Sequence, residues 1–453
     1  MNRSLHICGG FFLLAALAVQ ATPGARAADS AATVAASVRE EFLHAWRGYR
    51  ALAWGHDELR PVSGTARDWY GTPFDMTAVD ALDTMILMGL RAEADSTREF
   101  IAAHLSFDRD VEVKNFEFTI RFLGGLLSSY QLTGDRRLLA LATDLGRRLM
   151  PAFRSPTGLP YVMVNLRTGA VRGNVTNPAE AGTLLIEFGT LARLTGDARF
   201  YDAAKRSLAE VFRRRSPLGL VGSAIDVESG AWVETDSHVS GGIDSYYEYL
   251  VKCWRLFGDE DCRRMWQASV PALNRWLADT AGGGLWYGHA DMATGKRTQT
   301  LYGALDAFFP AVLCLSGDIP RAAQLENSCF RMWARYGVEP ELIDYRTMTA
   351  VDSAYELRPE IIESAYYLYH YTHDVRYRRM GETMFGALKR YCRTPHGYAA
   401  LANVGTKLQA DAMESYALAE TFKYLYLLFA PAGTLDFDAV TFNTEAHPLR
   451  RTW

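Results

Sequence analysis

The sequence predicts an all-α fold, an (α/α)7 barrel in which seven helical hairpins close into an α/α toroid. Three observations predict it: a Gly-Asp pair recurs about every 60 residues, each pair separates an apolar helical segment from an amphipathic one, and sustained period-2 alternation is scarce. A period near 60 suits one helical hairpin per repeat. Glycine-rich stretches at residues 159–168 and 282–288 predict short accessory β-hairpins in the loops.

The aspartates of the repeat set its period. They are separated by 62, 62, 59 and 56 residues and are Asp135, Asp197, Asp259, Asp318 and Asp374. Glycine precedes the first four, and His373 takes that place in the fifth. Glycine ends a helix readily because it adopts the left-handed conformation, and aspartate caps the helix that follows. Each pair therefore predicts the turn of a helical hairpin.

Helices are predicted on both sides of these turns from their apolar patterns. Apolar, aromatic-rich helices are expected over residues 117–130 and 244–257, and an amphipathic partner over residues 136–149. Further apolar helices over residues 80–90 and 414–429 extend the series to seven hairpins. The first helix of each pair is apolar nearly all round and is expected inside the ring, whereas the second carries charge and is expected outside.

Composition and charge limit the function. The chain has 453 residues, of which 49% are hydrophobic and 22% charged, as in a folded globular protein. Lysine and arginine total 48 against 52 aspartates and glutamates, and the formal net charge is -4. Because no basic field exists to hold a polyanion, the sequence predicts no nucleic-acid partner.

The first residues indicate a secretory signal peptide over residues 1–27. Arg3 supplies its positive end, residues 11–19 its apolar segment, and Ala25-Arg26-Ala27 a small-x-small cleavage site. Residues 28–453 are then expected to form a single catalytic domain of an exported protein, periplasmic or secreted. Later stretches lack the ~20 uninterrupted apolar residues of a membrane span, so no membrane anchor is expected after cleavage.

Five cysteines follow residue 27, an odd number for an oxidising compartment. They are Cys253, Cys262, Cys314, Cys329 and Cys392. At most two disulfides form. Cys253/Cys262 and Cys314/Cys329 are the pairs close in sequence, but spacing leaves both open because helical geometry can hold either pair too far apart.

Acidic residues lie at or near the predicted starts of six of the seven inner helices. They are Asp80 and Asp83, Glu117, Glu180, Asp244, Glu360 and Glu414. In a toroid of parallel inner helices these starts converge on one end of the cavity, which predicts a pocket lined by carboxylates. For any single residue the alternative is that an acid in the first turn complements the helix dipole.

Three details favour a function. Arg121 lies four residues after Glu117 on an otherwise apolar helix, and a buried pair of that kind calls for a reason. Glu360 and Glu363 lead into a run of tyrosines, and Asp244 is likewise followed by aromatic residues. Sugars stack on such walls, although aromatic stripes at helical spacing are more often part of a core.

Motifs of other chemistries are missing from the sequence. It contains no G-x-S-x-G, H-E-x-x-H, C-x-x-C, Walker A or G-x-G-x-x-G pattern. An acid-rich pocket can supply both the proton donor with a raised pKa and the base that glycoside hydrolysis requires. Acid-base glycosidase chemistry is therefore the prediction from the residues alone.

Seven segments resemble one family across nearly all of residues 28–453. They are Asp80-Ala-Leu-Asp-Thr84, Phe116-Glu-Phe-Thr-Ile-Arg-Phe-Leu-Gly-Gly-Leu-Leu127, Ala179-Glu-Ala-Gly-Thr183, Gly242-Ile-Asp-Ser-Tyr-Tyr-Glu-Tyr249, Leu357-Arg-Pro-Glu360 with Glu363-Ser364, Met413-Glu-Ser415 with Leu418-Ala-Glu-Thr421, and Phe442-Asn-Thr-Glu-Ala-His-Pro448. They resemble glycoside hydrolase family 47, the class I α-1,2-mannosidases. The resemblance implies an (α/α)7 barrel and an inverting, exo-acting, calcium-dependent hydrolase that removes terminal α-1,2-linked mannose from mannose-rich glycans or oligosaccharides.

The resemblance also implies roles for single residues. Glu117 matches the general acid, Glu360 the base that activates water, and Asp244 a third catalytic carboxylate, with two of these roles exchangeable. Thr444 matches the residue that binds Ca²⁺ through its carbonyl and hydroxyl oxygens, which suits calcium's preference for oxygen ligands. Sugar or supporting contacts are matched by Arg121, Arg358, Tyr416, Glu420 and Glu445, and further cavity acids by Glu180, Glu187, Glu363 and Glu414.

The chain departs from the family pattern at the fifth inner helix. Ala304 and Ala307 stand where many processing mannosidases have a sugar-contacting histidine and a disulfide cysteine. This argues against a Cys314/Cys329 bridge and is similar to the endoplasmic-reticulum degradation-enhancing branch. Tyr416 also stands where phenylalanine is usual beneath the sugar.

Two other functions compete with the hydrolase. One is a mannose-glycan-binding protein on the same scaffold without turnover, against which the presence of both Glu117 and Glu360 argues. The other is a different α/α-toroid enzyme, such as a six-hairpin glycosidase or a polysaccharide lyase. A lyase acts on acidic polymers, which an acid-rich cavity would repel.

Overall fold

The computed structural model describes residue 1 and residues 23–451, the side chains of residues 23–30 excepted. Residues 2–22 of the predicted signal peptide lie outside the described part. The predicted cleavage point after Ala27 falls within the first helix, α1 (Pro23–Leu52). Among the described helices, none combines the length and apolar character needed to cross a membrane.

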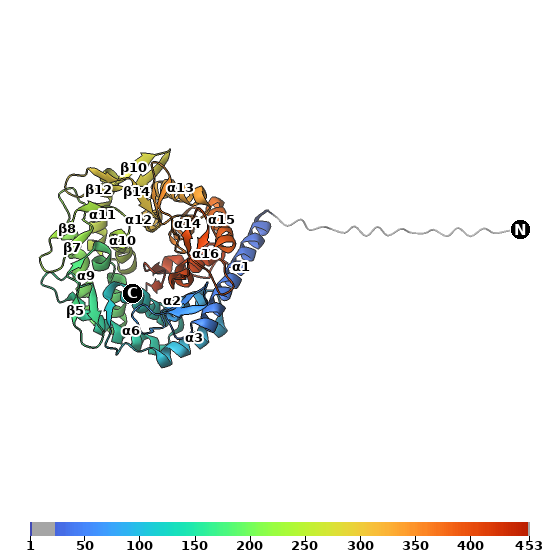
Figure 1. Cartoon of the computed structure of the whole chain (residues 1–453), viewed down its shortest axis with the longest axis horizontal. Coiled ribbons are helices and arrows are strands. Elements are labelled where there is room, and N and C mark those ends of the chain that lie inside the picture. The colour runs from blue at the N-terminus through green and yellow to red at the C-terminus, as the bar shows by residue number, and fades with distance from the viewer. Residues whose placement is uncertain (2–22, 452–453) are drawn as a thin grey trace.

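The helices form two concentric rings (Figure 1), which confirms the predicted (α/α)7 barrel. Within the described residues, the seven inner positions are α2 (Met76–Leu87); α4 (Asn115–Glu117), η1 (Phe118–Leu123) and α5 (Gly124–Thr133); α7 (Pro178–Gly182) and α8 (Leu185–Thr195); α10 (Asp244–Phe257); η3 (Leu305–Phe308) and α12 (Phe309–Ser316); α14 (Glu360–Thr372); and η4 (Ala417–Thr421) and α16 (Phe422–Phe429). The outer helices are α1, α3 (Arg91–His104), α6 (Arg136–Leu149), α9 (Ala198–Arg213), α11 (Glu260–Trp276), α13 (Ile319–Tyr336) and α15 (Val375–Tyr391).

The Gly-Asp pairs form the predicted turns between inner and outer helices. The four glycines end their helices in the left-handed conformation with φ between 68° and 92°, and His373 does so at 54°. Each following aspartate accepts a backbone N–H from the first turn of the next helix, as Asp135 does from Arg137. The repeat in the sequence is therefore a repeat of one capped hairpin.

The ring is closed by a helix from outside the repeat. Within the described residues no outer helix follows the last inner helix, α16, and α1 packs against it instead. Phe42 of α1 meets Phe422 edge to face, with ring centroids 6.3 Å apart. The seventh hairpin is therefore made of two segments that are far apart in the sequence.

Two predicted helix starts are displaced. The helix expected over residues 80–90 begins at Met76, which places Asp80 and Asp83 beyond its first turn, and the helix expected from Glu414 begins at Ala417. The first start is set by a distant residue, because the buried carboxylate of Asp57 accepts the N–H of Phe74 at 2.6 Å and that of Met76 at 3.3 Å. Tertiary contacts, not local pattern, begin this helix.

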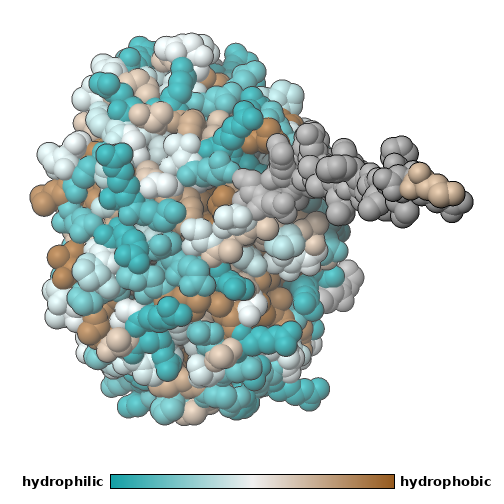
Figure 2. All heavy atoms as spheres, turned by 90° about the vertical axis from the view of Figure 1, so that its right-hand side faces the viewer, coloured by the Kyte–Doolittle hydropathy of each residue, from teal (hydrophilic) through white to brown (hydrophobic). Residues whose placement is uncertain are grey.

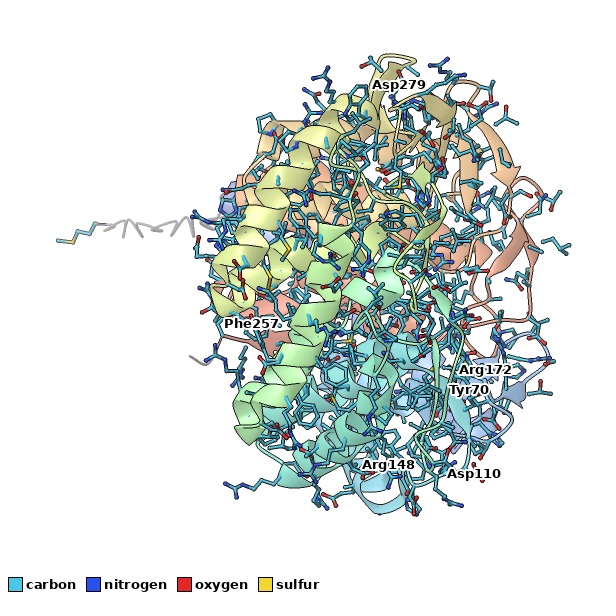
Figure 3. The ribbon with its side chains drawn as sticks, turned by 90° about the vertical axis from the view of Figure 1, so that its left-hand side faces the viewer. Tyr70, Asp110, Arg148, Arg172, Phe257 and Asp279 are labelled. Atoms are coloured by element: carbon cyan, nitrogen blue, oxygen red, sulfur yellow. A yellow bond between two sulfur atoms is a disulfide. The ribbon has the colours of Figure 1, made fainter. Side chains whose placement is uncertain are left out.

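Short antiparallel strands occupy the loops at the end of the barrel where the inner helices begin, except for the hairpin β19–β20, which follows the last inner helix. Figure 3 shows the barrel from the side: Phe257, the last residue of α10, lies at one end, and Tyr70 and Arg172 lie toward the other. The sheets are β1 (Glu58–Arg60) with β2 (Thr65–Arg67); β3 (Glu112–Lys114), β4 (Met163–Asn165) and β5 (Val171–Arg172); β6 (Val175–Thr176), β7 (Ala224–Asp226) and β8 (Trp232–Glu234); β9 (Asp236–Ser237), β12 (His289–Asp291) and β13 (Arg297–Gln299); β10 (Ala278–Ala281) with β11 (Gly284–Tyr287); β14 (Leu301–Gly303), β15 (Leu342–Asp344) and β16 (Thr349–Asp352); β17 (Leu401–Asn403) with β18 (Leu408–Gln409); and β19 (Val440–Phe442) with β20 (Pro448–Arg450).

Both predicted loop hairpins lie in strand-forming regions. The stretch at residues 282–288 includes the turn and second strand of β10–β11, whereas residues 159–168 supply only the middle strand, β4, of a three-stranded sheet.

On the face drawn in Figure 2, hydrophilic side chains predominate between scattered apolar ones.

The disulfide question is settled by helix geometry. Cys253 of α10 and Cys262 of α11 face each other across the intervening turn, with Cα atoms 6.1 Å apart, and are bonded. Cys314, Cys329 and Cys392 are buried free thiols. The argument against a Cys314/Cys329 bridge is therefore confirmed.

Candidate functional site

One cavity of about 260 Å³ opens at the end of the barrel where the inner helices begin. Residues at or near the starts of four inner segments, α4, α7, α10 and α14, form much of its wall. Its charged lining consists of Lys114, Glu117, Arg121, Glu180, Asp244, Arg358, Glu360, Glu420 and Glu445. Of the acids predicted to converge on one pocket, Glu117, Glu180, Asp244 and Glu360 line this cavity, whereas Asp80, Asp83 and Glu414 do not.

The hairpin β19–β20 fills the barrel from the opposite end. The N–H of Arg450 donates to Oε1 of Gln131, near the last turn of α5, at 2.8 Å. The turn between the two strands reaches the first half of the same inner helix, where Asn443 Nδ2 donates to the carbonyl of Ile120. The cavity therefore ends on this hairpin, and Thr444 at its tip forms part of the floor.

Asn443 fixes the tip of the hairpin. Its Nδ2 donates to the carbonyl of Ile120 at 2.8 Å and to Oε1 of Glu187 at 2.9 Å. Its Oδ1 accepts the N–H groups of Glu445 at 2.9 Å and His447 at 2.7 Å. Because Asn443 is fully buried, these four bonds hold the turn in one conformation.

A buried charge cluster supports the same turn from below. Lys423 lies 2.8 Å from one oxygen of Asp83 and donates to the carbonyl of Ala446 at 2.6 Å, while His447 Nδ1 lies 2.8 Å from the other Asp83 oxygen. Burial opposes a charge on Asp83, but Lys423 and His447 outweigh it and lower the pKa of Asp83 to about 2. Asp83 and Asp80 likewise outweigh the effect of burial on His447 and raise its pKa to about 9.

Glu117 ends α4, and Arg121 lies in the π-helical turn η1 that follows it. Arg121 Nε donates to Glu117 Oε2 at 2.9 Å, and Nη1 donates to Glu445 of the hairpin. The same Nη1 lies 3.6 Å from Asp80. The predicted i,i+4 pair is therefore present at the cavity wall, and Arg121 connects three acids.

Burial raises the pKa of two cavity acids that begin helices. It raises that of Glu360 to about 8, although the guanidinium of Arg358 opposes the rise. It raises that of Asp244 to about 7, against the hydrogen bond from the Ser245 N–H and with help from the charge of Glu248. Both groups therefore retain protons near neutral pH.

Arg358 and Tyr416 form the polar and aromatic side of the cavity. Arg358 Nε donates to Glu341 Oε2 at 2.9 Å, and its guanidinium carbon lies 5.4 Å from the centre of the Tyr416 ring. The Tyr416 hydroxyl donates to the carbonyl of Glu356 at 2.7 Å. The ring is thereby fixed against the loop between β16 and α14.

A smaller chamber of about 40 Å³ adjoins the cavity. Its charged lining is Asp244, Glu248, Glu360, Glu363 and Glu420, and Thr444 also lines it. One oxygen of Glu360 is buried without a hydrogen-bond partner among the described residues. This set of oxygen donors fits a hard cation such as Ca²⁺.

Most of the sequence-predicted site residues meet at these two spaces. Glu117, Asp244, Glu360, Arg121, Arg358, Tyr416, Glu420, Glu445, Glu180 and Thr444 line the cavity, and Glu363 lines the chamber. Glu414 lies outside this lining and pairs with Arg67 at 3.1 Å. Its carboxylate precedes the displaced helix start, which explains its position.

The sequence reasoning missed the supporting residues. Asn443 and Lys423 hold the hairpin, Lys252 pairs with Glu248, and Glu341 holds Arg358. A lysine in an otherwise apolar helix was the available signal for Lys252 and Lys423, because a buried charge needs a partner.

The comparisons with known proteins agree with this geometry. The model of glycosyl hydrolase family 47 matches residues 41–451. Alpha-mannosidase I MNS5 of Arabidopsis thaliana is 38% identical over 442 residues, covering 91% of this chain and 76% of that protein. The human endoplasmic reticulum mannosyl-oligosaccharide 1,2-alpha-mannosidase is 36% identical over 444 residues, covering 91% and 63%. The alpha-1,2-mannosidase from Trichoderma reesei superposes with a TM-score of 0.86 at 27% identity, covering 92% and 99%.

Proposed function

The chain belongs to glycosyl hydrolase family 47, and on that basis we propose that it is an inverting, exo-acting, calcium-dependent α-1,2-mannosidase. Its substrates would be the terminal α-1,2-linked mannoses of mannose-rich glycans or oligosaccharides. The observation that carries the proposal is that Glu117, Asp244 and Glu360, from three inner segments, line one cavity together with Thr444. The named activities of the relatives supply the linkage.

The shape of the cavity supports exo action. Its volume of about 260 Å³ is near the lower end of the range of ligand pockets, about 300–1,000 Å³. The hairpin tip with Thr444 forms its floor, so a sugar chain can enter but cannot run through. A pocket of this kind accepts the end of a chain.

The acids divide into proton donors and a base. Asp244, whose pKa burial raises to about 7, holds a proton near neutral pH, and Glu117 lies next to Arg121 on the neighbouring wall. We assign delivery of the proton to the leaving oxygen to these two residues, and activation of the attacking water to Glu360. Inversion then requires the water to attack the anomeric carbon from the face opposite the leaving group.

Thr444 and the acids of the smaller chamber, chiefly Glu360 and Glu363, would hold the cation. When bound, Ca²⁺ would supply positive charge that keeps these carboxyls ionised and would fix sugar hydroxyls. Ionisation matters for Glu360, because burial raises its pKa to about 8 and a protonated carboxyl cannot act as a base. Arg358 and Tyr416 orient the sugar from the other side.

Proton NMR of the purified protein with α-1,2-mannobiose tests the proposal, first with Ca²⁺ and then with excess chelator. The expected first product is β-mannose, and its formation stops with chelator. Glu360→Gln is expected to lower kcat by about 10²–10⁴-fold, whereas Glu99→Gln, an exposed acid paired with Arg137, serves as the control and leaves it unchanged.

Three outcomes would contradict parts of this proposal. α-Mannose as the first product would exclude inversion, and turnover unaffected by chelator would exclude calcium dependence. Binding of mannobiose without turnover would favour a mannose-glycan-binding protein on the same scaffold.

A further inference from the structure

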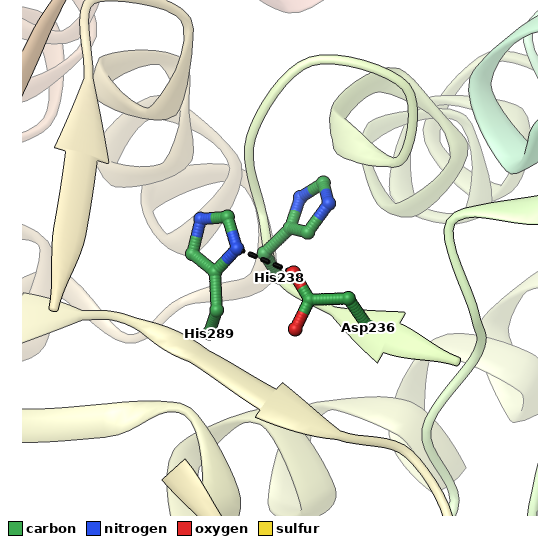
Figure 4. A group of neighbouring side chains, drawn as sticks. All are labelled: Asp236, His238 and His289. Atoms are coloured by element: carbon green, nitrogen blue, oxygen red, sulfur yellow. Dashed lines mark hydrogen bonds and ion pairs between the residues drawn. The ribbon is translucent and has the colours of Figure 1, made fainter. Parts of the chain in front are cut away.

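A second cluster of ionisable side chains lies apart from the cavity lining. Asp236 belongs to β9, His238 follows it directly, and His289 begins β12 (Figure 4). One donor atom from each residue lies within 4.8 Å of the other two. His289 Nδ1 is 2.6 Å from Asp236 Oδ2, and the two imidazole rings stack with centroids 4.4 Å apart.

The strand register explains why these three residues meet. β9 and β12 are antiparallel, with Ser237 opposite Ala290 and Asp236 opposite Asp291. Continuing that register places His238 opposite His289. Since side chains two residues apart share a face of a strand, Asp236 and His238 point to the same side, and His289 meets them across the pair. The backbone therefore presents two imidazoles and one carboxylate on one face.

We propose that Asp236, His238 and His289 bind a divalent transition-metal ion of the zinc class, which ties β9 to β12. Two histidines and one carboxylate are a common protein ligand set for Zn²⁺. Ligand distances of about 2.0–2.2 Å require the donors to lie within about 4.2 Å of one another. Donors already within 4.8 Å need only a small closure.

The surroundings of His289 supply an independent observation. His289 Nε2 is buried and has no hydrogen-bond partner among the described residues, and the same holds for Asp306 Oδ1. The two side chains are close enough for a charge on His289 to oppose the rise that burial causes in the pKa of Asp306. A histidine bound to a metal through one nitrogen typically donates its other N–H to a carboxylate. Asp306 would take that role once the ion is bound.

The carboxylate of Asp236 is also oriented by a hydrogen bond from Thr298. Thr298 Oγ1 donates to Asp236 Oδ1 at 2.6 Å, which leaves Oδ2 directed to His289. Three protein ligands leave one position of a tetrahedral site for water. Hydrogen bonds thus already orient the Asp236 carboxylate toward His289 before an ion binds.

The ion would act on the cavity through the backbone, not on the substrate. The three residues are not part of the cavity lining formed by the described residues. The N–H of Ser240 lies 3.2 Å from His238 Nδ1, and because a neutral imidazole has one lone pair, His238 would exchange this contact for the ion. The next residues, Gly241, Gly242 and Asp244, do line the cavity. Fixing His238 would thus steady the segment that carries Asp244. The inference does not depend on the proposed hydrolase activity.

Metal binding to the full chain, freed of any affinity tag and stripped with chelator, tests the proposal. The protein is titrated with ZnCl2 in excess CaCl2, which occupies the carboxylates of the cavity, and bound zinc is measured after desalting. About one zinc per chain is expected, with a rise of a few degrees in the unfolding temperature. Co²⁺ in place of Zn²⁺ should give the visible absorption of a low-symmetry N/O site.

Two ligand variants and a matched control separate this site from incidental binding. His238→Gln and His289→Gln are expected to weaken zinc binding by about tenfold or more, and to lose the rise in unfolding temperature. His56→Gln is the control, because His56 Nδ1 is 2.9 Å from Asp68 in an exposed pair without a second histidine. It should bind zinc as the unsubstituted protein does.

The proposal is overturned if the unsubstituted protein binds no zinc in excess calcium. It is equally overturned if both histidine variants keep the zinc, or if His56→Gln loses it to the same extent. Should the variants fold poorly, the Co²⁺ spectrum of the unsubstituted protein still decides, since an octahedral aquo spectrum would exclude imidazole ligands.

Discussion

Replacement of Asn443 by alanine tests whether the hairpin tip is held by one side chain. The substitution removes four hydrogen bonds and leaves two buried N–H groups, those of Glu445 and His447, without their acceptor. At about 1 kcal/mol each, four bonds predict a loss of about 4 kcal/mol in the free energy of unfolding. Natural proteins have only about 5–15 kcal/mol in total, so the loss is large.

Urea unfolding followed by circular dichroism measures this loss. Asn403→Ala is the matched control, because Asn403 also makes hydrogen bonds through both ends of its amide, to Ser353, Gly405 and Thr406, but at the half-buried end of β17. The control is expected to cost about 1 kcal/mol, since water replaces the lost partners. Equal costs for the two variants would refute the view that Asn443 fixes the tip.

Three further predictions concern charge, covalent bonding and the sugar site. The acids around His447 outweigh burial and raise its pKa from 6.5 to about 9. Its protonation therefore contributes about 3 kcal/mol to the free energy of unfolding, fully below pH 6.5, and this contribution is lost as the pH rises through 9. His447→Gln should flatten the pH profile of the unfolding free energy in that window, and an unchanged slope would contradict the charge assignment. Reduction of the Cys253–Cys262 bond should lower the free energy of unfolding, measured in urea, by about 2–3 kcal/mol. The variant in which both cysteines are replaced by serine should show no effect of the reductant. Glu341→Gln removes the charge that holds Arg358 and should raise KM about tenfold with little change in kcat; a loss confined to kcat would place Glu341 in the chemical step.

The part of the fold that the sequence predicts well is the part set by local chemistry. The turn at Gly196-Asp197 needs only a glycine that adopts the left-handed conformation and an aspartate that caps, and both effects act over a few residues. The start at Met76 could not be predicted in this way, because the carboxylate that caps it belongs to Asp57. The outer position of α1 likewise depends on a contact between the two ends of the chain.

In the candidate site, too, the sequence predicts the residues set by local patterns better than those set by tertiary contacts. Glu117, Asp244 and Glu360 were found because acids at helix starts converge in any toroid, and the family resemblance then gave them roles. The π-helical turns over η1 and η4, which carry Arg121 and Glu420, leave no local pattern, because the extra residue per turn is stabilised by tertiary packing. The hairpin tip was recognised only through the resemblance, since its polar sequence is typical of a solvated tail.

The buried acids of the cavity and the chamber raise a question of charge that concerns them as a group. Glu360, Glu363 and Glu445 are each buried, and burial raises the pKa of each, to about 8, 7 and 8, even though Arg358, Lys252 and Arg121 respectively oppose it. The three cations are therefore insufficient to ionise the pocket at neutral pH. Ionisation of all the acids needs further positive charge, so protons and the proposed Ca²⁺ compete for the same oxygens. The affinity for calcium and the pH range of activity are thus expected to shift together.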